Sequence, residues 1–125
     1  MNNVKSSEIG KYGETVARDF LISKGHTIEK SNYHSRYGEI DIIAKNNDFI
    51  IFVEVKARSE NSIDRPISFV TKSKQNKIIK TALDYIGKNH ITIQPRFDII
   101  EVFLSSKKIR HIKNAFLWEE EYAPF

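Results

Sequence analysis

Two charged residues, Glu54 and Lys56, interrupt an apolar run that otherwise has the composition of a buried β-strand, residues 49–58 (FIIFVEVKAR). Because alternate residues of a strand point to the same face, Glu54 and Lys56 share one surface, whereas Val53 and Val55 face the opposite side. An unpaired charge on a core-facing surface is strongly destabilising. The rest of the sequence must therefore supply partners for both charged groups.

Asp41 is the first candidate partner, and it lies in a second strand-like segment, residues 38–44 (GEIDIIA). If the hairpin loop spans residues 46–49, Asp41 lies directly opposite Glu54. If the loop has only two residues, Glu39 lies opposite Glu54 and Asp41 becomes its diagonal neighbour. A three-residue loop would break this arrangement unless a bulge restored it. In the first two registers, one face carries Glu39, Asp41, Glu54 and Lys56.

Carboxylates this close together repel one another unless a cation lies between them. Lys56 is one such cation, and a divalent metal ion is another. Mg²⁺ binds few protein carboxylates, keeps several waters and completes its coordination with phosphate oxygens. We therefore predict a Mg²⁺ or Mn²⁺ site formed by Asp41, Glu54 and the carbonyl of Val55. Lys56 would position the attacking water or neutralise charge on the scissile phosphate, which is the chemistry of metal-assisted phosphodiester hydrolysis.

A further acidic residue, Glu14, belongs to a predicted amphipathic helix over residues 7–24. At about 100° per residue, Glu14 lies at the border of the apolar stripe and could lean toward the same metal ion. Alternatively, it is a solvent-exposed residue that pairs with Arg18 at position i+4. Gly10 and Gly13 weaken this helix, so we expect the helix to approach a sheet closely at these residues.

A stretch without acidic residues, residues 65–83, carries Lys and Arg at five positions. Thr71 is expected to cap a helix that runs to about Asn89, so Lys72 and Lys74 fall in its first turn, where the helix dipole disfavours cations. A bound phosphate would compensate for this, although a solvated lysine face is the alternative. The residues predicted to bind nucleic acid are Lys72, Lys74, Gln75, Lys77, Arg36 and Arg58.

The order of the predicted elements is a helix, three strands, a helix and then one or two strands. The first three strands read as an antiparallel meander, and the whole predicts an α/β fold with a central mixed sheet flanked by helices. The predicted strands cover residues 27–33, 39–44, 49–58, 94–104 and 109–113. Arg96 and Asp98 share a strand face, which favours a structural ion pair over the alternative of a role at the site. Residues 114–125 are not assigned to an element.

Length and composition set limits on the class of protein. With 125 residues, of which 40% are hydrophobic, the chain predicts one domain, residues 1–125. It has no cysteine, which excludes disulfides, thiolate metal sites and a cysteine nucleophile. No signal peptide and no run of about 18 apolar residues occurs, so we predict a cytoplasmic protein without a membrane partner. The net charge of +4 is compatible with an anionic partner.

The motifs together resemble a known family. GEIDIIA, FVEVKAR, the earlier KYGETVARDFLISKGH and the later RFDII are similar to the bacterial YraN family of uncharacterised predicted endonucleases. That family resembles the Holliday-junction-resolvase-like branch of the PD-(D/E)XK nuclease superfamily, and the similarity spans about residues 10–114. It implies a restriction-endonuclease-like fold, Mg²⁺ ligands at Asp41 and Glu54, a catalytic Lys56 and an accessory acid at Glu14. One departure is Ile40, which stands where the superfamily's name has proline.

Three functions are compatible with these residues. The first is a metal-dependent endonuclease acting on DNA, including branched or otherwise structured DNA. The second is a nucleic-acid-binding module of the same fold without turnover, which acts with a partner in DNA repair, recombination or uptake. The third is a structural or protein-interaction domain whose strand charges form ion pairs. Resolvase-like relatives cut paired strands as dimers, so a homodimer is one assembly to consider.

Overall fold

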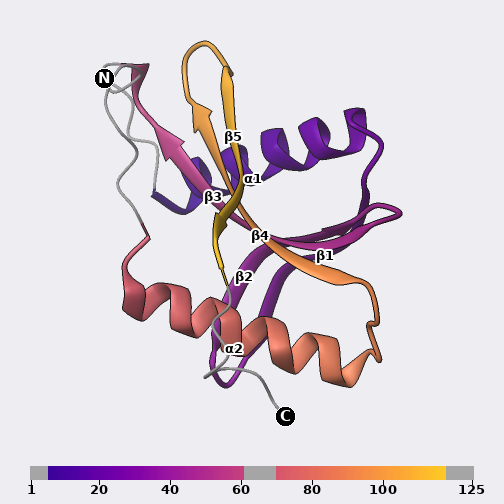
Figure 1. Ribbon diagram of the computed structural model, residues 1–125. Coiled ribbons are helices and arrows are strands. Elements are labelled where there is room, and N and C mark those ends of the chain that lie inside the picture. Colours follow the sequence, from indigo (N-terminus) through magenta and orange to yellow (C-terminus); the bar gives the residue numbers. More distant parts are fainter. Residues whose placement is uncertain (1–5, 61–69, 118–125) are drawn as a thin grey trace.

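The computed structural model describes residues 6–60 and 70–117, which form a five-stranded sheet with a helix on each face (Figure 1). The predicted α/β fold is confirmed, and the arrangement is consistent with a restriction-endonuclease-like fold. In chain order, the elements are α1 (Ser6–Ser23), β1 (Thr27–Ser35), β2 (Gly38–Lys45), β3 (Phe49–Arg58), α2 (Lys72–Lys88), β4 (Gln94–Phe103) and β5 (Ile109–Phe116).

The strands lie in the sheet in their chain order, β1-β2-β3-β4-β5. β1, β2 and β3 form the predicted antiparallel meander, and β5 is antiparallel to β4. β3 and β4 are parallel, because the chain returns through α2 to the starting end of the sheet. The sheet is therefore mixed, as predicted, and β3 and β4 lie at its centre, where both faces are covered.

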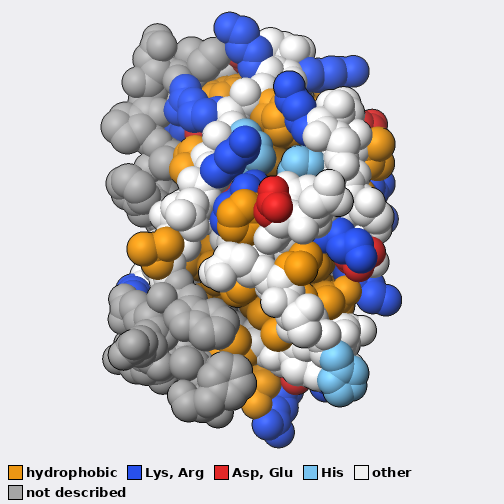
Figure 2. Space-filling model, turned by 45° about the vertical axis from the view of Figure 1, so that its right-hand side comes forward, with side chains coloured by type: hydrophobic (Ala, Val, Ile, Leu, Met, Phe, Trp, Pro, Cys, Tyr) orange, Lys and Arg blue, Asp and Glu red, His pale blue; other side chains and the backbone are white. Residues whose placement is uncertain are grey.

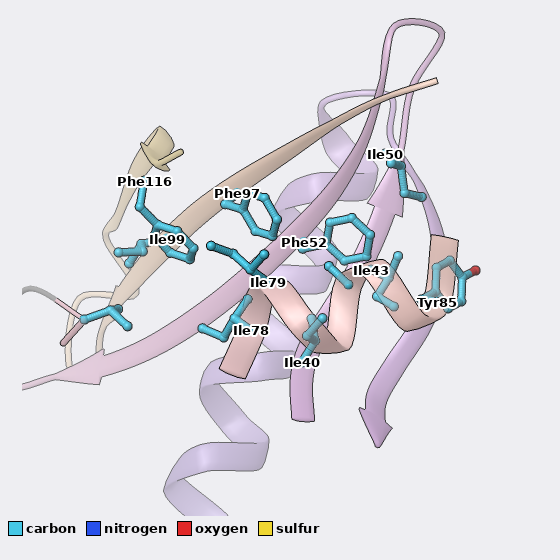
Figure 3. Close-up of a cluster of buried hydrophobic side chains, with 12 residues drawn as sticks. Ile40, Ile43, Ile50, Phe52, Ile78, Ile79, Tyr85, Phe97, Ile99 and Phe116 are labelled. Atoms are coloured by element: carbon cyan, nitrogen blue, oxygen red, sulfur yellow. The ribbon is translucent and has the colours of Figure 1, made fainter. Parts of the chain in front are cut away.

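Each helix buries its apolar stripe against a different face of the sheet. The cluster under α2, drawn in Figure 3, includes Ile40, Ile43, Ile50, Phe52, Ile78, Ile79, Ala82, Tyr85, Phe97, Ile99 and Phe116. The cluster under α1 consists of Ala17, Leu21, Ile42, Ala44, Ile51, Val53, Ile100 and Val102. Val53 lies in the α1 cluster and Val55 packs against it, so the predicted alternation of β3 is confirmed.

The predicted helix signals have clear structural counterparts. The hydroxyl of Thr71 accepts a hydrogen bond from the Lys74 N–H at 3.2 Å, so Thr71 caps α2 as predicted. At Gly13, an added Cβ would lie 3.5 Å from the Cβ of Ala57, which confirms the expected close approach of α1 to β3. The same expectation is wrong for Gly10, because no atom would lie within 4 Å of its Cβ.

The last strand is longer than predicted. β5 continues to Phe116, which is 8% exposed and stacks on Phe97, with ring centroids 5.2 Å apart. Residues 118–125 of the predicted tail and residues 61–69, which include Arg65, lie outside the described part of the chain. No helix of the described part is both long and apolar enough to cross a membrane.

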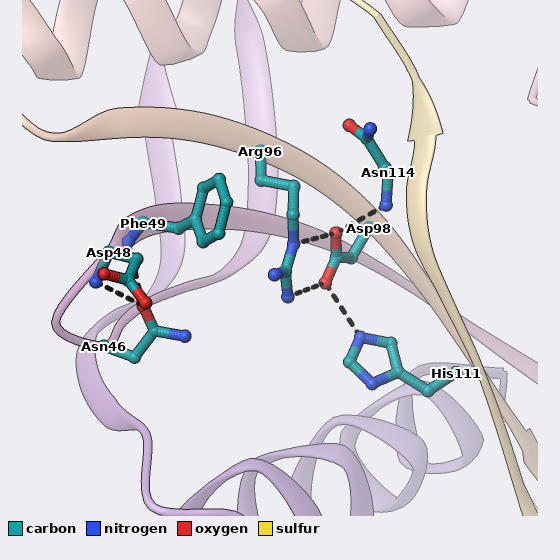
Figure 4. A network of polar contacts seen from close by, with 7 residues as sticks. All are labelled: Asn46, Asp48, Phe49, Arg96, Asp98, His111 and Asn114. Carbon is teal, nitrogen blue, oxygen red and sulfur yellow. Dashed lines mark hydrogen bonds and ion pairs between the residues drawn. The ribbon is translucent and has the colours of Figure 1, made fainter.

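A buried acidic group joins β4 to β5 (Figure 4). The carboxylate of Asp98 accepts hydrogen bonds from Arg96 at 2.9 and 2.8 Å, and it also contacts Nε2 of His111 at 2.8 Å. The backbone N–H of Asn114 donates to the same group at 3.0 Å. Burial by itself raises the pKa of Asp98, but these hydrogen bonds outweigh burial and hold it below its usual value. The predicted Arg96–Asp98 ion pair is thus confirmed.

Asp98→Asn should destabilise the fold by about 3–5 kcal/mol at pH 7, because it removes the buried charge that pairs with Arg96. The folded-state pKa is lowered, so this stabilisation is present above the usual carboxyl pKa and is lost as the pH falls through the folded-state value. Urea denaturation at pH 7 and at pH 3 measures both effects, and the deficit of the variant should shrink at pH 3. The exposed Asp19→Asn is the matched control, and an equal loss in both variants would contradict the prediction.

Candidate functional site

The predicted catalytic residues line one pocket of about 210 Å³, between the first half of α1, the first turn of α2 and the neighbouring strands β2 and β3. Its walls are formed by Gly10, Glu14, Glu39, Asp41, Glu54, Val55, Lys56, Ala57 and Lys74. The structure thus brings together every residue predicted to hold the metal ion or to act on the phosphate. A larger pocket of about 520 Å³ is lined by apolar and neutral polar residues with Arg96, and none of the described residues that line it is acidic.

The β2–β3 hairpin has the register that places Asp41 opposite Glu54. Lys45 pairs with Ile50, as the four-residue loop requires, and the side-chain oxygen of Asn46 closes this loop by accepting from two backbone N–H groups. The paired ladder ends at Ile42 and Val53, one position before Asp41 and Glu54. Beyond it, the carboxylate of Asp41 accepts a hydrogen bond from the Val55 N–H at 2.8 Å. The first of the two predicted registers is therefore confirmed.

The alternation of side chains along β2 is interrupted at Asp41. Ile40 and Ile43 both belong to the cluster under α2, whereas Ile42 belongs to the cluster under α1. A regular strand would place residues 40 and 43 on opposite faces. On the neighbouring strand, Asn32 has φ 53°, a left-handed conformation that asparagine tolerates better than most residues. The sheet is irregular at this point, and Asp41 reaches a pocket lined by residues of both helices.

The carboxylate of Glu54 makes its neighbour Asp41 harder to ionise. Burial, together with the charge of Glu54 and a hydrogen bond to it, raises the pKa of Asp41 to about 8. The Val55 N–H acts in the opposite direction, and Glu14 adds a smaller repulsion. Glu54 itself is only 7% exposed. At neutral pH the folded protein therefore favours a protonated Asp41 beside Glu54, unless a cation enters the pocket.

The surroundings of Glu14 contain both the pocket and Arg18, the two partners that were predicted for it. It lines the pocket, and burial is the main cause of its raised pKa. A hydrogen bond with Asn32 and the charge of Arg18 act in the opposite direction. Asn32 thus links α1 to the irregular position of β1. Sequence reasoning missed this residue, and its only local signal is the tolerance of asparagine for positive φ.

Lysine side chains provide the positive charge of the pocket. Nζ of Lys74 lies 2.5 Å from Oε2 of Glu54, which connects the first turn of α2 to β3. Lys56 also lines the pocket and lies close enough to Lys74 to interact with it. Glu39 is at the rim, because its carboxylate is about two-thirds exposed and lies 3.3 Å from Nδ1 of His34.

The other residues predicted to bind nucleic acid have different environments. Arg58 pairs with Glu101, which is fully buried and also contacts Arg110 at 3.3 Å. The side-chain amide of Gln75 donates to the carbonyl of Val70, and Arg36 stacks on Tyr37 at the tip of the β1–β2 hairpin. The structure does not bring Arg58, Gln75 or Arg36 into the carboxylate pocket.

A second pocket of about 330 Å³ adjoins the first and shares Glu39 and Lys74 with it. Lys77 and Thr71 also line this pocket, so the start of α2 forms one of its walls. Lys72 is the first residue of the same helix. Basic residues are also present elsewhere: on the face shown in Figure 2, Lys and Arg side chains are most frequent toward the end of the molecule that carries the β4–β5 hairpin.

The chemistry of the donor set favours a hard cation with few protein ligands. Within residues 6–60 and 70–117, no group of three or more His, Cys, Asp or Glu side chains could hold a metal ion. A structural zinc site requires four such ligands, whereas Mg²⁺ is bound by one or two carboxylates together with waters and phosphate oxygens. Asp41 and Glu54 fit the second description.

Asp41→Asn should stabilise the metal-free protein at pH 8 and have less effect at pH 5. The folded-state pKa of Asp41 is raised, so its favourable contribution is complete below the usual carboxyl pKa and is lost as the pH rises toward about 8. Asparagine stays neutral and can still accept from the Val55 N–H. Thermal melts in the presence of a chelator measure the difference, with the exposed Asp48→Asn as the control. A variant less stable than the wild type at pH 8 would contradict the raised pKa.

Comparison with known proteins shows that the chain is similar to one family of proteins. Residues 13–102 match the model of a family described as "Uncharacterised protein family UPF0102". A UPF0102 protein of Clostridioides difficile strain 630 is 51% identical over 117 residues, covering 93% of this chain and all of the relative. A UPF0102 protein of Thermodesulfovibrio yellowstonii is 44% identical over 109 residues, covering 87% and 96% of the two chains. A similar protein of Clostridium botulinum strain Loch Maree is 44% identical over 117 residues, covering 89% and 95%.

Proposed function

The chain belongs to the uncharacterised protein family UPF0102, and we propose that it is a metal-dependent endonuclease that hydrolyses phosphodiester bonds in DNA. One observation carries the proposal: the carboxylates of Asp41 and Glu54 lie together in a pocket that also contains Lys56. This combination of acidic and basic groups suits a divalent cation and a phosphate group better than it suits a structural role.

A purely structural role explains the pocket poorly. Structural ion pairs elsewhere in this fold give a buried carboxylate several donors, as Arg96 and His111 do for Asp98. In the pocket, by contrast, Asp41 faces a second carboxylate, and its pKa is raised. A carboxyl group whose pKa is raised by folding lowers the stability of the fold at neutral pH. Such a loss of stability commonly accompanies a functional site.

The residues of the pocket have distinct roles in this proposal. Asp41 and Glu54 would hold Mg²⁺ or Mn²⁺, with the carbonyl of Val55 as a third ligand. When bound, the ion supplies Lewis acidity and lowers the pKa of a coordinated water. Lys56 orients the attacking water or neutralises charge on the scissile phosphate. Glu14, whose pKa is raised by burial, would serve as an accessory acid at the edge of the pocket.

The basic start of α2 supports DNA as the substrate. Lys74 and Lys77 line the second pocket, and Lys72 precedes them in the same helix. Lysines in this position bind phosphate groups without reading the base sequence. The proposal therefore includes branched or otherwise structured DNA, with a homodimer as the assembly that would cut paired strands.

The same surface favours a second candidate function, a nucleic-acid-binding module without turnover. Lys77 lines the second pocket but not the carboxylate pocket, so part of the basic surface can act without the carboxylates. Such a module would act with a partner in DNA repair, recombination or uptake. DNA binding in this case would weaken with salt and survive the loss of Asp41.

Mn²⁺ or Mg²⁺ should raise the melting temperature of the wild type, because an ion that binds only the folded state stabilises it. A concentration of about 100 times the dissociation constant adds about 2.7 kcal/mol. Asp41→Ala should abolish the increase, whereas Asp48→Asn should leave it intact. Differential scanning calorimetry with and without the ion measures the effect. The absence of any shift in the wild type at millimolar ion concentrations would contradict the proposed metal site.

End-labelled linear, flapped and four-way-junction DNA should be cleaved by the wild type in the presence of Mn²⁺ or Mg²⁺. Lys56→Ala should lose this activity by about 10²-fold or more, as expected for a group that stabilises charge in the transition state. Lys80→Ala, an exposed residue on α2, is the control that should retain activity. If a folded protein that binds the metal ion cleaves none of these substrates, the binding-module function is favoured.

A further inference from the structure

We infer that Lys74 is an internal counter-ion of Glu54. A divalent metal ion must displace the Lys74 ammonium from Glu54, and the displaced ammonium then becomes available to a phosphate group of DNA. The inference rests on the proposed function and assigns Lys74 as a positioning residue that couples metal binding to DNA binding. It starts from the contact between Nζ of Lys74 and Oε2 of Glu54, at 2.5 Å.

The contact places an ammonium group where the proposed metal ion would bind. The side chain of Glu54 is only 9% exposed, so this carboxylate obtains little stabilisation from solvent. One oxygen of its neighbour Asp41 accepts from the Val55 N–H. Without a metal ion, the charge of Glu54 is therefore compensated mainly by Lys74, because a poorly solvated carboxylate needs a paired cation.

A metal ion and the Lys74 ammonium exclude one another from this position. Lys74 occupies Oε2 of Glu54, the proposed metal ion would bind the same carboxylate, and the pocket that contains them has a volume of about 210 Å³. Two like charges at such short range repel strongly in a partly buried site. Metal binding therefore includes the free energy of breaking the Lys74–Glu54 ion pair.

The position of Lys74 allows its side chain to move while its backbone stays in place. Its N–H donates to the hydroxyl of Thr71, which fixes the residue in the first turn of α2. Its side chain is 47% exposed, and a lysine stem has several rotatable bonds. Lys74 also lines the second pocket, together with Lys77 and Ser73. A displaced ammonium can thus turn toward this pocket without any movement of the helix.

The helix dipole places a partial positive charge at the start of α2. This charge disfavours cations and favours a bound phosphate group there. A DNA phosphate in the second pocket would pair with the released Lys74. Metal and DNA would then assist each other, because each one favours the same position of the Lys74 side chain. By linkage, the factor by which DNA strengthens metal binding equals the factor by which metal strengthens DNA binding.

The test compares Lys74→Met with Lys77→Met, which removes the same charge about one turn further along α2. Isothermal titration calorimetry with Mn²⁺ alone should show that Lys74→Met binds the ion more tightly than the wild type, by about two- to fivefold. This factor in affinity corresponds to the free energy that a half-exposed ion pair contributes. Lys77→Met should bind Mn²⁺ much as the wild type does, because Lys77 lines only the second pocket. The metal-free melting temperature should fall in Lys74→Met, since Glu54 loses its partner.

A second measurement tests the coupling directly. Fluorescence anisotropy gives the affinity for a short labelled DNA duplex with and without Mn²⁺, with Lys56→Met present in every protein so that no cleavage occurs. Mn²⁺ should strengthen DNA binding when Lys74 is present and should have a much smaller effect when it is replaced. In the Lys77→Met protein, the Mn²⁺ effect should persist even though overall DNA affinity is lower.

The outcomes separate this inference from the proposed function. If Mn²⁺ binds the wild type through Asp41 and Glu54 but no more tightly to Lys74→Met, Lys74 is not a competing cation and only the inference fails. An equal gain in Lys77→Met would show a general charge effect and would also overturn it. If the wild type binds no Mn²⁺ at all, the proposed metal site fails and the inference fails with it.

Discussion

The repulsion between the carboxylates of Asp41 and Glu54 is the physical constraint around which this molecule is arranged. The two groups are brought together by the hairpin of β2 and β3, and burial prevents water from screening them fully. A proton on Asp41 and the ammonium of Lys74 relieve the repulsion in the protein alone. A divalent cation would relieve it more completely, because one ion can compensate both charges.

The rest of the fold supplies the rigidity that this unfavourable pair requires. β3 carries Glu54 and Lys56 and is held between the parallel neighbour β4 and the antiparallel neighbour β2, with apolar clusters on both faces. On β4, the buried carboxylates of Asp98 and Glu101 are paired with donors from β5 and from the end of β3. These paired groups join the strands, whereas the carboxylates that repel each other lie in the pocket, which is the usual division between a scaffold and a site.

Both helices contribute to the pocket as well as to the core. α1 brings Glu14 to the pocket one position after Gly13, where the missing side chain lets the helix approach β3 closely. α2 begins beside the pocket because Thr71 caps it there, and its first turn carries Lys74. Glu14 and Lys74 therefore come from helices on opposite faces of the sheet, and they line the same pocket where β2 and β3 cease to pair.

Local patterns in the sequence were sufficient for the helices, for the order of the strands and for grouping Asp41, Glu54 and Lys56. The alternation in residues 49–58 places Glu54 and Lys56 on one face, and the cap at Thr71 marks the start of α2, because such signals depend only on nearby residues. The sequence left two hairpin registers open, and the structure selects the one that pairs Asp41 with Glu54.

The partner of each charged side chain, by contrast, depends on how distant segments pack. Lys74 contacts Glu54 across the packing of α2 on the sheet, and Arg58 contacts Glu101 through the parallel pairing of β3 with β4. The interrupted alternation at Asp41 and the contact between Asn32 and Glu14 also arise from neighbouring strands and helices. The sequence alone determined that Asp41, Glu54 and Lys56 lie together, and tertiary packing decided which other residues join them and how their charges are paired, because these contacts join segments far apart in the chain.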